Sequence, residues 1–302
     1  MERRRALQLL AAGCALGAVP ARAQAEPVRT RAIPASGERI PVVGLGTWIT
    51  FDVGGADSAP RRARGDVLRA FLAGGGRLVD SSPMYGSSEE VIGAELARTP
   101  GAATFSATKV WTTGGLAGRR QMEHSRELWR LKGIDLMQVH NLLDWETHWP
   151  TLRAWKAEGR YRYIGMTTSH GRRHDELERI LRRERLDFVQ FTYNLNDRSV
   201  EEALLPVAAE RGVAVIVNRP FDGGGLFDAR TRKPLPGWAA EIGCRSWAEA
   251  FLKWVVSHPA VTCAIPATSQ LAHQQENLRA LSGPLPDAAM RLRIAQDFRS
   301  SA

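Results

Sequence analysis

The stretch LVDSSPMYGSSEEVIG (residues 78–93) places three different features directly after one another. An apolar run ends at Asp80, a loop of small residues carries Tyr85, and a segment with helical periodicity begins near residue 87. A strand followed by a loop and a helix is the repeating unit of α/β proteins. Two interpretations are open at this point: ordinary turn chemistry, or a proton-transfer site at the tip of a strand.

The same strand–loop–helix order recurs along the chain. Strand-like apolar runs occupy residues 42–46, 77–80, 103–109, 135–140, 163–167, 187–191, 213–217 and 262–266. Segments with helical periodicity occupy residues 64–74, 87–97, 118–131, 147–157, 173–184, 200–210, 246–257 and 271–281. The apolar runs are continuous, as is typical of parallel strands that are buried on both faces. Eight such units over about 240 residues match the size of a (β/α)8 barrel.

A short hairpin precedes the first unit, because two short strand-like runs flank the turn residues Ser36 and Gly37. The competing architecture is a doubly wound open sheet. That sheet would carry a glycine-rich fingerprint and a helix directly after its first strand, and residues 44–55 (GLGTWITFDVGG) offer no helix there. The sequence therefore predicts an α/β fold: a (β/α)8 TIM barrel with a short N-terminal β-hairpin.

The N-terminal residues have the composition of an export signal. Arginines at positions 3–5 precede an apolar segment at about 6–19, and Pro20 and the triplet Ala23-Gln24-Ala25 follow. We expect residues 1–25 to be a cleaved signal peptide, read by the twin-arginine export machinery, with residues 26–302 forming one barrel domain in the periplasm. A basic N-terminus without this role is the alternative.

The bulk composition excludes some classes of partner. The chain of 302 residues is 44% hydrophobic and 24% charged, with a formal charge of +9, and removing residues 1–25 would leave +6. No Lys/Arg stripe with interleaved aromatic residues suggests a nucleic-acid site. No apolar run in the body is long enough for a stable membrane span. Cys244 and Cys263 would survive cleavage, and whether they pair is open.

Chemically capable side chains stand at the predicted carboxyl ends of three consecutive strands, where (β/α)8 enzymes carry their active sites. Asp80, Lys109 and His140 end these strands, and Tyr85 lies in the loop after the first of them. Taken singly, they could be an ion pair, a rim histidine and a turn residue. Together they suit proton transfer: a lysine fixed by a carboxylate should lower the pKa of the phenol, and the histidine could polarise a carbonyl oxygen.

Five motifs now show a resemblance to the aldo/keto reductases over roughly residues 28–282: GLGTW (44–48), VDSSPMYGSSEEVIG (79–93), ATKVW (107–111), MQVHN (137–141) and IGMT (164–167). The segment IPATSQLAHQQENL (265–278) resembles the last motif of that family. The resemblance implies a catalytic tetrad of Asp80, Tyr85, Lys109 and His140, with Tyr85 as the general acid. It also implies a small-molecule carbonyl substrate and no metal ion.

The resemblance further implies a nicotinamide dinucleotide lying across the top of the barrel, with NADP(H) favoured and NAD(H) as the second option. The implied cofactor-binding residues are Gly46, Thr47, Thr167, Thr168, Gln190, Asn218, Arg219, Pro220, Phe221, Gly223, Gly224, Gly225, Ala267, Thr268, His273, Glu276 and Asn277. Trp48 and Trp111 correspond to aromatic walls of the substrate pocket.

Three positions depart from the family pattern. Asn218 replaces the aromatic residue that usually stacks on the nicotinamide ring. Ala267 and His273 replace a frequent lysine and a frequent arginine, which grip the 2′-phosphate of NADP in the family. Arg219 or Arg279 could compensate for these cations, and the sequence does not choose between them.

The sequence thus predicts an exported NAD(P)H-dependent reductase of an aldehyde or a ketone. The alternative is a non-catalytic barrel that keeps a dinucleotide as a sensor or a structural ligand. The intact tetrad favours the enzyme, and the departures at Asn218, Ala267 and His273 favour the alternative.

Overall fold

The computed structural model describes residues 27–55 and 57–300. The predicted signal peptide at residues 1–25 lies outside the described residues. The described part begins with an antiparallel hairpin of β1 (Thr30–Ala32) and β2 (Arg39–Pro41), which are paired so that Thr30 faces Pro41. The predicted N-terminal hairpin is therefore confirmed.

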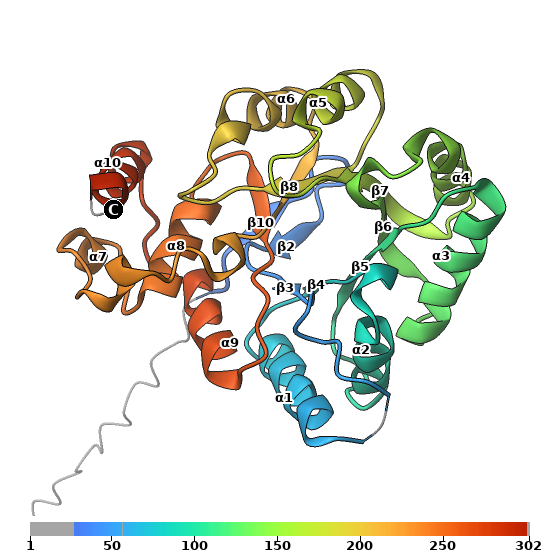
Figure 1. Cartoon of the computed structure of the whole chain (residues 1–302), viewed down its shortest axis with the longest axis horizontal. Helices are drawn as coiled ribbons and strands as arrows, with labels where there is room; N and C mark the ends of the chain where they lie inside the picture. Colours follow the sequence, from blue (N-terminus) through green and yellow to red (C-terminus); the bar gives the residue numbers. More distant parts are fainter. Residues whose placement is uncertain (1–26, 56, 301–302) are drawn as a thin grey trace, which may run out of the picture.

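Eight parallel strands follow and close into a barrel (Figure 1). They are β3 (Leu45–Gly46), β4 (Leu78–Asp80), β5 (Phe105–Val110), β6 (Ile134–Val139), β7 (Tyr161–Thr167), β8 (Phe188–Thr192), β9 (Ala214–Asn218) and β10 (Val261–Ala264). Each strand pairs with the next one along the chain, and bridges from Val43 to Ala264 and from Gly46 to Ala267 join the first and last strands. The predicted (β/α)8 barrel is confirmed. At most strand ends, the predicted and observed boundaries differ by no more than two residues.

Helices surround the barrel (Figure 1). The main ones are α1 (Ala59–Ala73), α2 (Ser88–Ala97), α3 (Gly115–Trp129), α4 (Trp145–Ala157), α5 (His174–Arg183), α6 (Leu204–Glu210), α8 (Trp247–Val256) and α9 (Leu271–Leu278). The first of these begins five residues before the predicted start at residue 64, because the Ser58 hydroxyl accepts a hydrogen bond from the Arg61 amide and Pro60 occupies the first turn.

Two further helices were not predicted: α7 (Trp238–Glu241) and α10 (Ala288–Ser300). The last helix packs on α8, where the rings of Phe298 and Phe251 lie 5.7 Å apart in an edge-on arrangement. The Trp254 indole also donates a hydrogen bond of 3.1 Å to the Arg291 carbonyl. Met290, Ile294 and Phe298 are spaced four residues apart, so this segment does carry a helical period, and its packing on α8 fixes where the helix lies.

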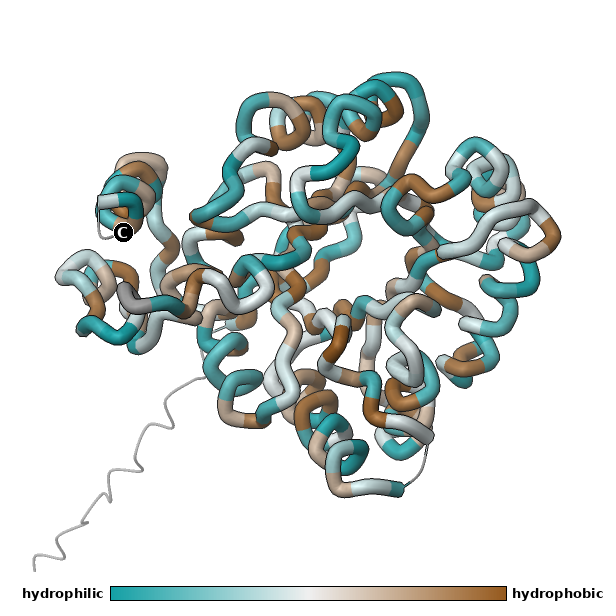
Figure 2. Tube along the Cα trace, in the orientation of Figure 1, coloured by the Kyte–Doolittle hydropathy of each residue, from teal (hydrophilic) through white to brown (hydrophobic). Residues whose placement is uncertain are grey.

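The apolar core has two layers, and hydrophobic residues accordingly concentrate on the strands and the inner faces of the helices (Figure 2). One layer lies between strands and helices, and the other fills the lower part of the barrel interior. In the interior layer, Phe105, Tyr163 and Phe188 pack together with ring centroids 5.5–5.8 Å apart. Ile33 and Ile40 of the hairpin region are fully buried and belong to the same cluster. The hairpin thus closes the amino-terminal end of the barrel, and the opposite end is left for the site.

Cys244 and Cys263 are both buried and are not joined to each other. Cys263 belongs to the barrel interior, where it acts as a small apolar side chain. Within the described ranges, no helix combines the length and the apolar character needed to cross a membrane.

Candidate active site

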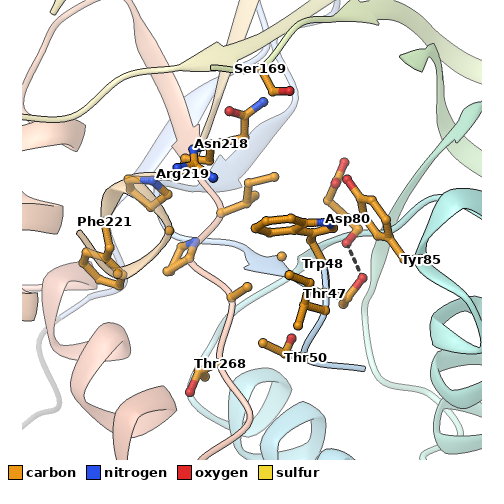
Figure 3. Close-up of a pocket in the computed structure, with 18 of the residues that line it drawn as sticks. Thr47, Trp48, Thr50, Asp80, Tyr85, Ser169, Asn218, Arg219, Phe221 and Thr268 are labelled. Atoms are coloured by element: carbon orange, nitrogen blue, oxygen red, sulfur yellow. Dashed lines mark hydrogen bonds between the residues drawn. The ribbon is translucent and has the colours of Figure 1, made fainter. Parts of the chain in front are cut away.

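A cavity of about 770 Å³ opens at the carboxyl ends of the barrel strands (Figure 3). Its wall includes Asp80, Tyr85 and His140 of the predicted tetrad, and Trp48 reaches into it from the loop after β3. Lys109 is fully buried directly behind the wall. The four predicted catalytic residues are therefore brought together, three on the cavity surface and one beneath it.

Asp80 and Lys109 form a buried ion pair. The Lys109 ammonium donates to Asp80 Oδ2 at 2.5 Å and to the Ser81 carbonyl at 2.7 Å, and the two side chains are almost completely hidden from solvent. Burial by itself lowers the pKa of Lys109, but the Asp80 charge and the contacts with Asp80 and Tyr85 outweigh it and raise the pKa overall. Lys109 is therefore a permanent cation below the cavity floor.

Tyr85 ends a short 3₁₀ turn, η1 (Pro83–Tyr85), in which the Met84 amide donates to the Ser82 hydroxyl. Its ring centroid lies 5.1 Å from Lys109 Nζ and 5.7 Å from the His140 ring, which it meets edge-on. The expectation of a lowered phenol pKa is wrong. Burial raises the pKa of Tyr85, and the Lys109 charge and hydrogen bond, which lower it, only partly offset that effect. The phenol consequently keeps its proton at neutral pH.

His140 directly follows β6 and is buried. Burial, assisted by the Lys109 charge, holds its pKa well below the usual range, so the ring is neutral. The Ser82 hydroxyl lies 2.9 Å from His140 Nδ1 and already accepts a hydrogen bond from the Met84 amide at 3.2 Å. When the Ser82 hydroxyl donates a hydrogen bond to Nδ1, the proton of the neutral ring is on Nε2. Nε2 can then donate a hydrogen bond to a ligand in the cavity.

Polar side chains continue across the top of the barrel interior, above the apolar layer. Gln138 and Gln190 donate to the second oxygen of Asp80 at 3.3 and 3.0 Å, so both carboxylate oxygens have partners. Asn218 donates to the Thr168 carbonyl at 2.9 Å and lies 3.4 Å from Gln190 Oε1. Because Gln190 and Asn218 also line the cavity, this network links the catalytic residues to the predicted cofactor side.

Most of the predicted cofactor-binding residues lie on the cavity wall. They are Gly46, Thr47, Thr167, Gln190, Asn218, Arg219, Pro220, Phe221, Gly223, Gly224, Ala267, Thr268, His273, Glu276 and Asn277. Thr168 and Gly225 are not among the lining residues; Thr168 is buried and contributes its carbonyl to Asn218. Trp48 lines the cavity, whereas Trp111 lies outside it and is 39% exposed.

The lining residues fit a dinucleotide in size and in chemistry. The volume is in the range of small-molecule sites, and the amides of Gln190 and Asn218 could hold a carboxamide. Arg219 provides a cation beside the glycines at 223 and 224. Gly224 has a φ of +102° and no atom within 4 Å of the position of a Cβ, so the backbone there can approach a ligand closely.

Neither of the two arginines considered as substitutes for the missing cations stands free. Arg279 lies 3.5 Å from Glu249 and 3.9 Å from Glu276. Arg219 pairs with Asp222 at 3.1 Å, and its guanidinium lies 6.0 Å from the Trp48 ring (Figure 3). The cavity end formed by Ala267, Thr268, His273 and Glu276 therefore gains no unpaired arginine from either source.

Several residues of the site were missed from the sequence. Ser82 forms a hydrogen bond with His140, and Gln138 donates one to Asp80. The sequence around Ser82 and Gln138 contains no motif that would indicate either contact. Further lining residues were not predicted: Ile49, Thr50, Met84, Asn141, Ser169, His170, Arg172, Phe227, Ala248, Ile265 and Pro266. Most of them belong to the loops that follow the strands. In a (β/α)8 barrel these loops surround the active site, so the predicted fold was a signal that could have identified these residues. Among residues 27–55 and 57–300, no group of His, Cys, Asp or Glu could hold a metal ion.

Comparison with known proteins gives the family. The sequence model of the Aldo/keto reductase family matches residues 42–293. An NADH-specific methylglyoxal reductase from Escherichia coli (strain K12) is 27% identical over 300 residues, covering 84% of this chain and 88% of that protein. An aldo-keto reductase from Bacillus subtilis (strain 168) is 28% identical over 193 residues, covering 58% of this chain and 56% of that protein.

Solved structures agree with this assignment. The aldo/keto reductase from Klebsiella pneumoniae in complex with NADP and acetate is similar with a TM-score of 0.75 and 25% identity, covering 90% of this chain and 96% of that chain. The chain therefore belongs to the aldo/keto reductase family of NAD(P)H-dependent oxidoreductases.

Proposed function

We propose that this protein reduces an aldehyde or a ketone to an alcohol, with Tyr85 as the general acid, Lys109 and Asp80 as its buried support and His140 as the residue that orients the carbonyl. The single observation that carries the proposal is the arrangement at the cavity floor. A phenol and a neutral imidazole share one cavity, and a buried Lys109–Asp80 pair with a 2.5 Å contact lies directly behind them.

The roles follow from the charge states. A carbonyl that accepts hydride develops negative charge on its oxygen, so it needs hydrogen-bond donors and then a proton. Neutral His140 donates a hydrogen bond from Nε2 to the carbonyl oxygen and so orients it. Because the ring is neutral, no free energy is spent on burying a charged imidazolium. Tyr85 supplies the proton, and the phenolate that forms is stabilised by the Lys109 cation. Asp80 keeps that cation in place through Oδ2.

The dinucleotide, when bound, supplies the hydride. We propose that Gln190, with Thr167 and the Asn218 amide beside it, holds the carboxamide. Arg219 and the backbone at Gly223 and Gly224 would hold the diphosphate, because a cation and close backbone donors suit that group.

For the cofactor we propose NADP(H) first and NAD(H) as a second option, with a small preference between them. The relative from Klebsiella is in complex with NADP, and the relative from Escherichia coli is NADH-specific. With Arg279 engaged by Glu249 and Glu276, we expect dissociation constants for NADPH and NADH that differ by less than about tenfold. Fluorescence titration of the purified protein with each cofactor measures this ratio, and a difference of a hundredfold would contradict it.

The central test is Tyr85→Phe. Loss of the proton donor should lower kcat for an aldehyde such as methylglyoxal by about a thousandfold, the middle of the range for general-acid catalysis. Cofactor affinity should stay within twofold, because the ring remains. Tyr161→Phe, at the opposite end of the barrel, is the matched control and should retain kcat. Parental turnover in Tyr85→Phe would remove Tyr85 from the mechanism, and cofactor binding without any turnover in the parent would favour the sensor.

We also propose that the protein is exported to the periplasm by the twin-arginine machinery, on the strength of the sequence at residues 1–25. Replacing Arg4 and Arg5 by lysine should retain the precursor in the cytoplasm. Mass spectrometry of the parental periplasmic protein should then find an N-terminus close to Glu26, and a full-length cytoplasmic product in the parent would contradict export.

A further inference from the structure

Basic side chains gather along one wall of the cavity. His170 and Arg172 belong to the loop between β7 and α5, and Arg219 directly follows β9. All three line the cavity, and we call these three residues the basic wall. The cavity lining also includes exposed apolar side chains, those of Trp48, Ile49 and Met84.

Arg219 is the fixed member of the basic wall. Its guanidinium pairs with Asp222 at 3.1 Å, its carbonyl accepts a hydrogen bond from Asn194, and it lies over Gly223, whose Cβ would come within 3.0 Å of it. Asp222 also accepts a hydrogen bond from Asn196. Arg219 is thus already paired with Asp222, and its remaining donors are assigned to the proposed diphosphate.

Arg172 is the uncommitted member. Its side chain is exposed, and it forms no ion pair with any other residue in the described part of the chain. His170, next to it, is held by a 3.0 Å contact between Nδ1 and the Ser169 hydroxyl. Burial lowers the pKa of His170, and the charges of Arg219 and Arg172 lower it further while Asp222 opposes them, so excess positive charge surrounds the ring.

The loop of Arg172 borders the carbonyl side of the site. The Ser169 hydroxyl donates to Asn141 Oδ1 at 3.2 Å, and Asn141 directly follows His140. Arg173 donates to the carbonyls of Asn141 and Leu142 at 3.0 and 2.9 Å. The loop that carries Arg172 therefore borders the loop that carries the carbonyl-orienting histidine.

We propose that Arg172, with His170 beside it, binds an acidic group of the carbonyl substrate, so that the preferred substrate is an aldehyde or ketone that also carries a carboxylate or another oxyanion. This inference rests on the proposed function. A guanidinium with no internal partner, in a cavity wall, can offer charge-assisted hydrogen bonds to such a group when the substrate enters. Arg172 then determines substrate specificity and leaves the chemistry to Tyr85 and His140.

The test uses two aldehydes of similar shape and different charge, 4-formylbenzoate and 4-methylbenzaldehyde. Calorimetric titration of the purified protein in saturating NADP⁺ measures binding without turnover, because the oxidised cofactor cannot deliver hydride. We expect the parent to bind 4-formylbenzoate at least tenfold more tightly. Arg172→Gln should abolish that preference and leave 4-methylbenzaldehyde within twofold, whereas Arg172→Lys should keep part of it. Arg120→Gln, an exposed arginine on α3, is the matched control.

The outcomes separate the interpretations. Loss of the preference in Arg172→Gln alone supports the proposal. A preference that survives Arg172→Gln, or no preference in the parent, overturns it. Weaker binding of NADP⁺ itself in Arg172→Gln, with the aldehyde preference unchanged, would assign the residue to the diphosphate and also overturn it. Because the measurement needs no catalysis, its result is independent of the Tyr85→Phe test of the proposed function.

Discussion

At the scale of residues, the site depends on a pair of opposite charges that is almost completely buried. Asp80 has hydrogen-bond donors on both oxygens, from Lys109 on one side and from Gln138 and Gln190 on the other. A buried pair of this kind contributes little net stability against an apolar replacement, but either partner left alone is strongly destabilising. The residues Asp80, Tyr85, Lys109 and His140 could be predicted because each stands at the end of a strand or in the loop after one.

Asp80→Asn should lower the free energy of unfolding by about 3 to 5 kcal/mol, because it leaves the Lys109 ammonium buried without a counter-ion. The double variant Asp80→Asn with Lys109→Met should recover much of that loss, since no buried charge remains. Urea unfolding followed by circular dichroism measures both. A double variant as unstable as the sum of the two single variants would contradict this account of the pair.

At the scale of elements, the helix after Tyr85 is tied to the strand that carries Lys109. Glu89 of α2 is buried and accepts hydrogen bonds from Thr108 at 2.5 Å, Ser125 at 3.0 Å and Trp129 at 3.0 Å. Burial raises the pKa of this carboxyl group, and the three donors only partly offset the effect. Thr108 directly precedes Lys109, so the contact between α2, α3 and β5 positions the lysine.

Gly93→Ala should disrupt that contact. An added Cβ would lie 1.9 Å from the Leu128 carbonyl of α3, so the two helices would have to separate, and we expect a loss of about 3 kcal/mol in the free energy of unfolding. Gly237→Ala is the matched control, because nothing lies within 4 Å of its Cβ position and its φ of −55° is ordinary. Its effect should be below about 0.5 kcal/mol. Thermal and urea unfolding measure the loss in each variant. If Gly93→Ala and Gly237→Ala lose the same free energy of unfolding, the close approach of α2 and α3 at Gly93 is contradicted.

At the scale of the whole molecule, one buried histidine, His140, and two half-buried ones, His174 and His258, are held in their neutral form. The pKa of His140 is well below its usual range, that of His174 is lowered by burial, and burial followed by the Arg291 charge lowers the pKa of His258 to about 4. In the unfolded chain these groups take up protons near pH 6.5, and in the folded protein they do not. Their contribution to stability is present above pH 6.5 and is lost as the pH falls toward 4.

His258→Asn should therefore reduce the pH dependence of unfolding between about pH 6.5 and 4. His258 Nδ1 accepts a hydrogen bond from the Ala260 amide, and the asparagine oxygen can replace that acceptor without titrating. The slope of unfolding free energy against pH should fall by an amount that integrates to about 1 to 2 kcal/mol, discounted for partial exposure. Glu89 acts in the opposite direction, since its pKa is raised, so the comparison is made between parent and variant. Superimposable pH profiles would contradict the role of His258.

The sequence by itself determined the order of strands and helices and, with it, the chemistry at the strand ends, because hydrophobic periodicity and turn residues act over a few neighbouring positions. Most of the cofactor wall followed from the same order. Only the tertiary structure decided that α10 covers α8, that Ser82 supports His140, that Arg279 is engaged by Glu249, and that burial raises the pKa of Tyr85. These outcomes depend on pairing across space and on the removal of water, and both arise only when distant segments pack together.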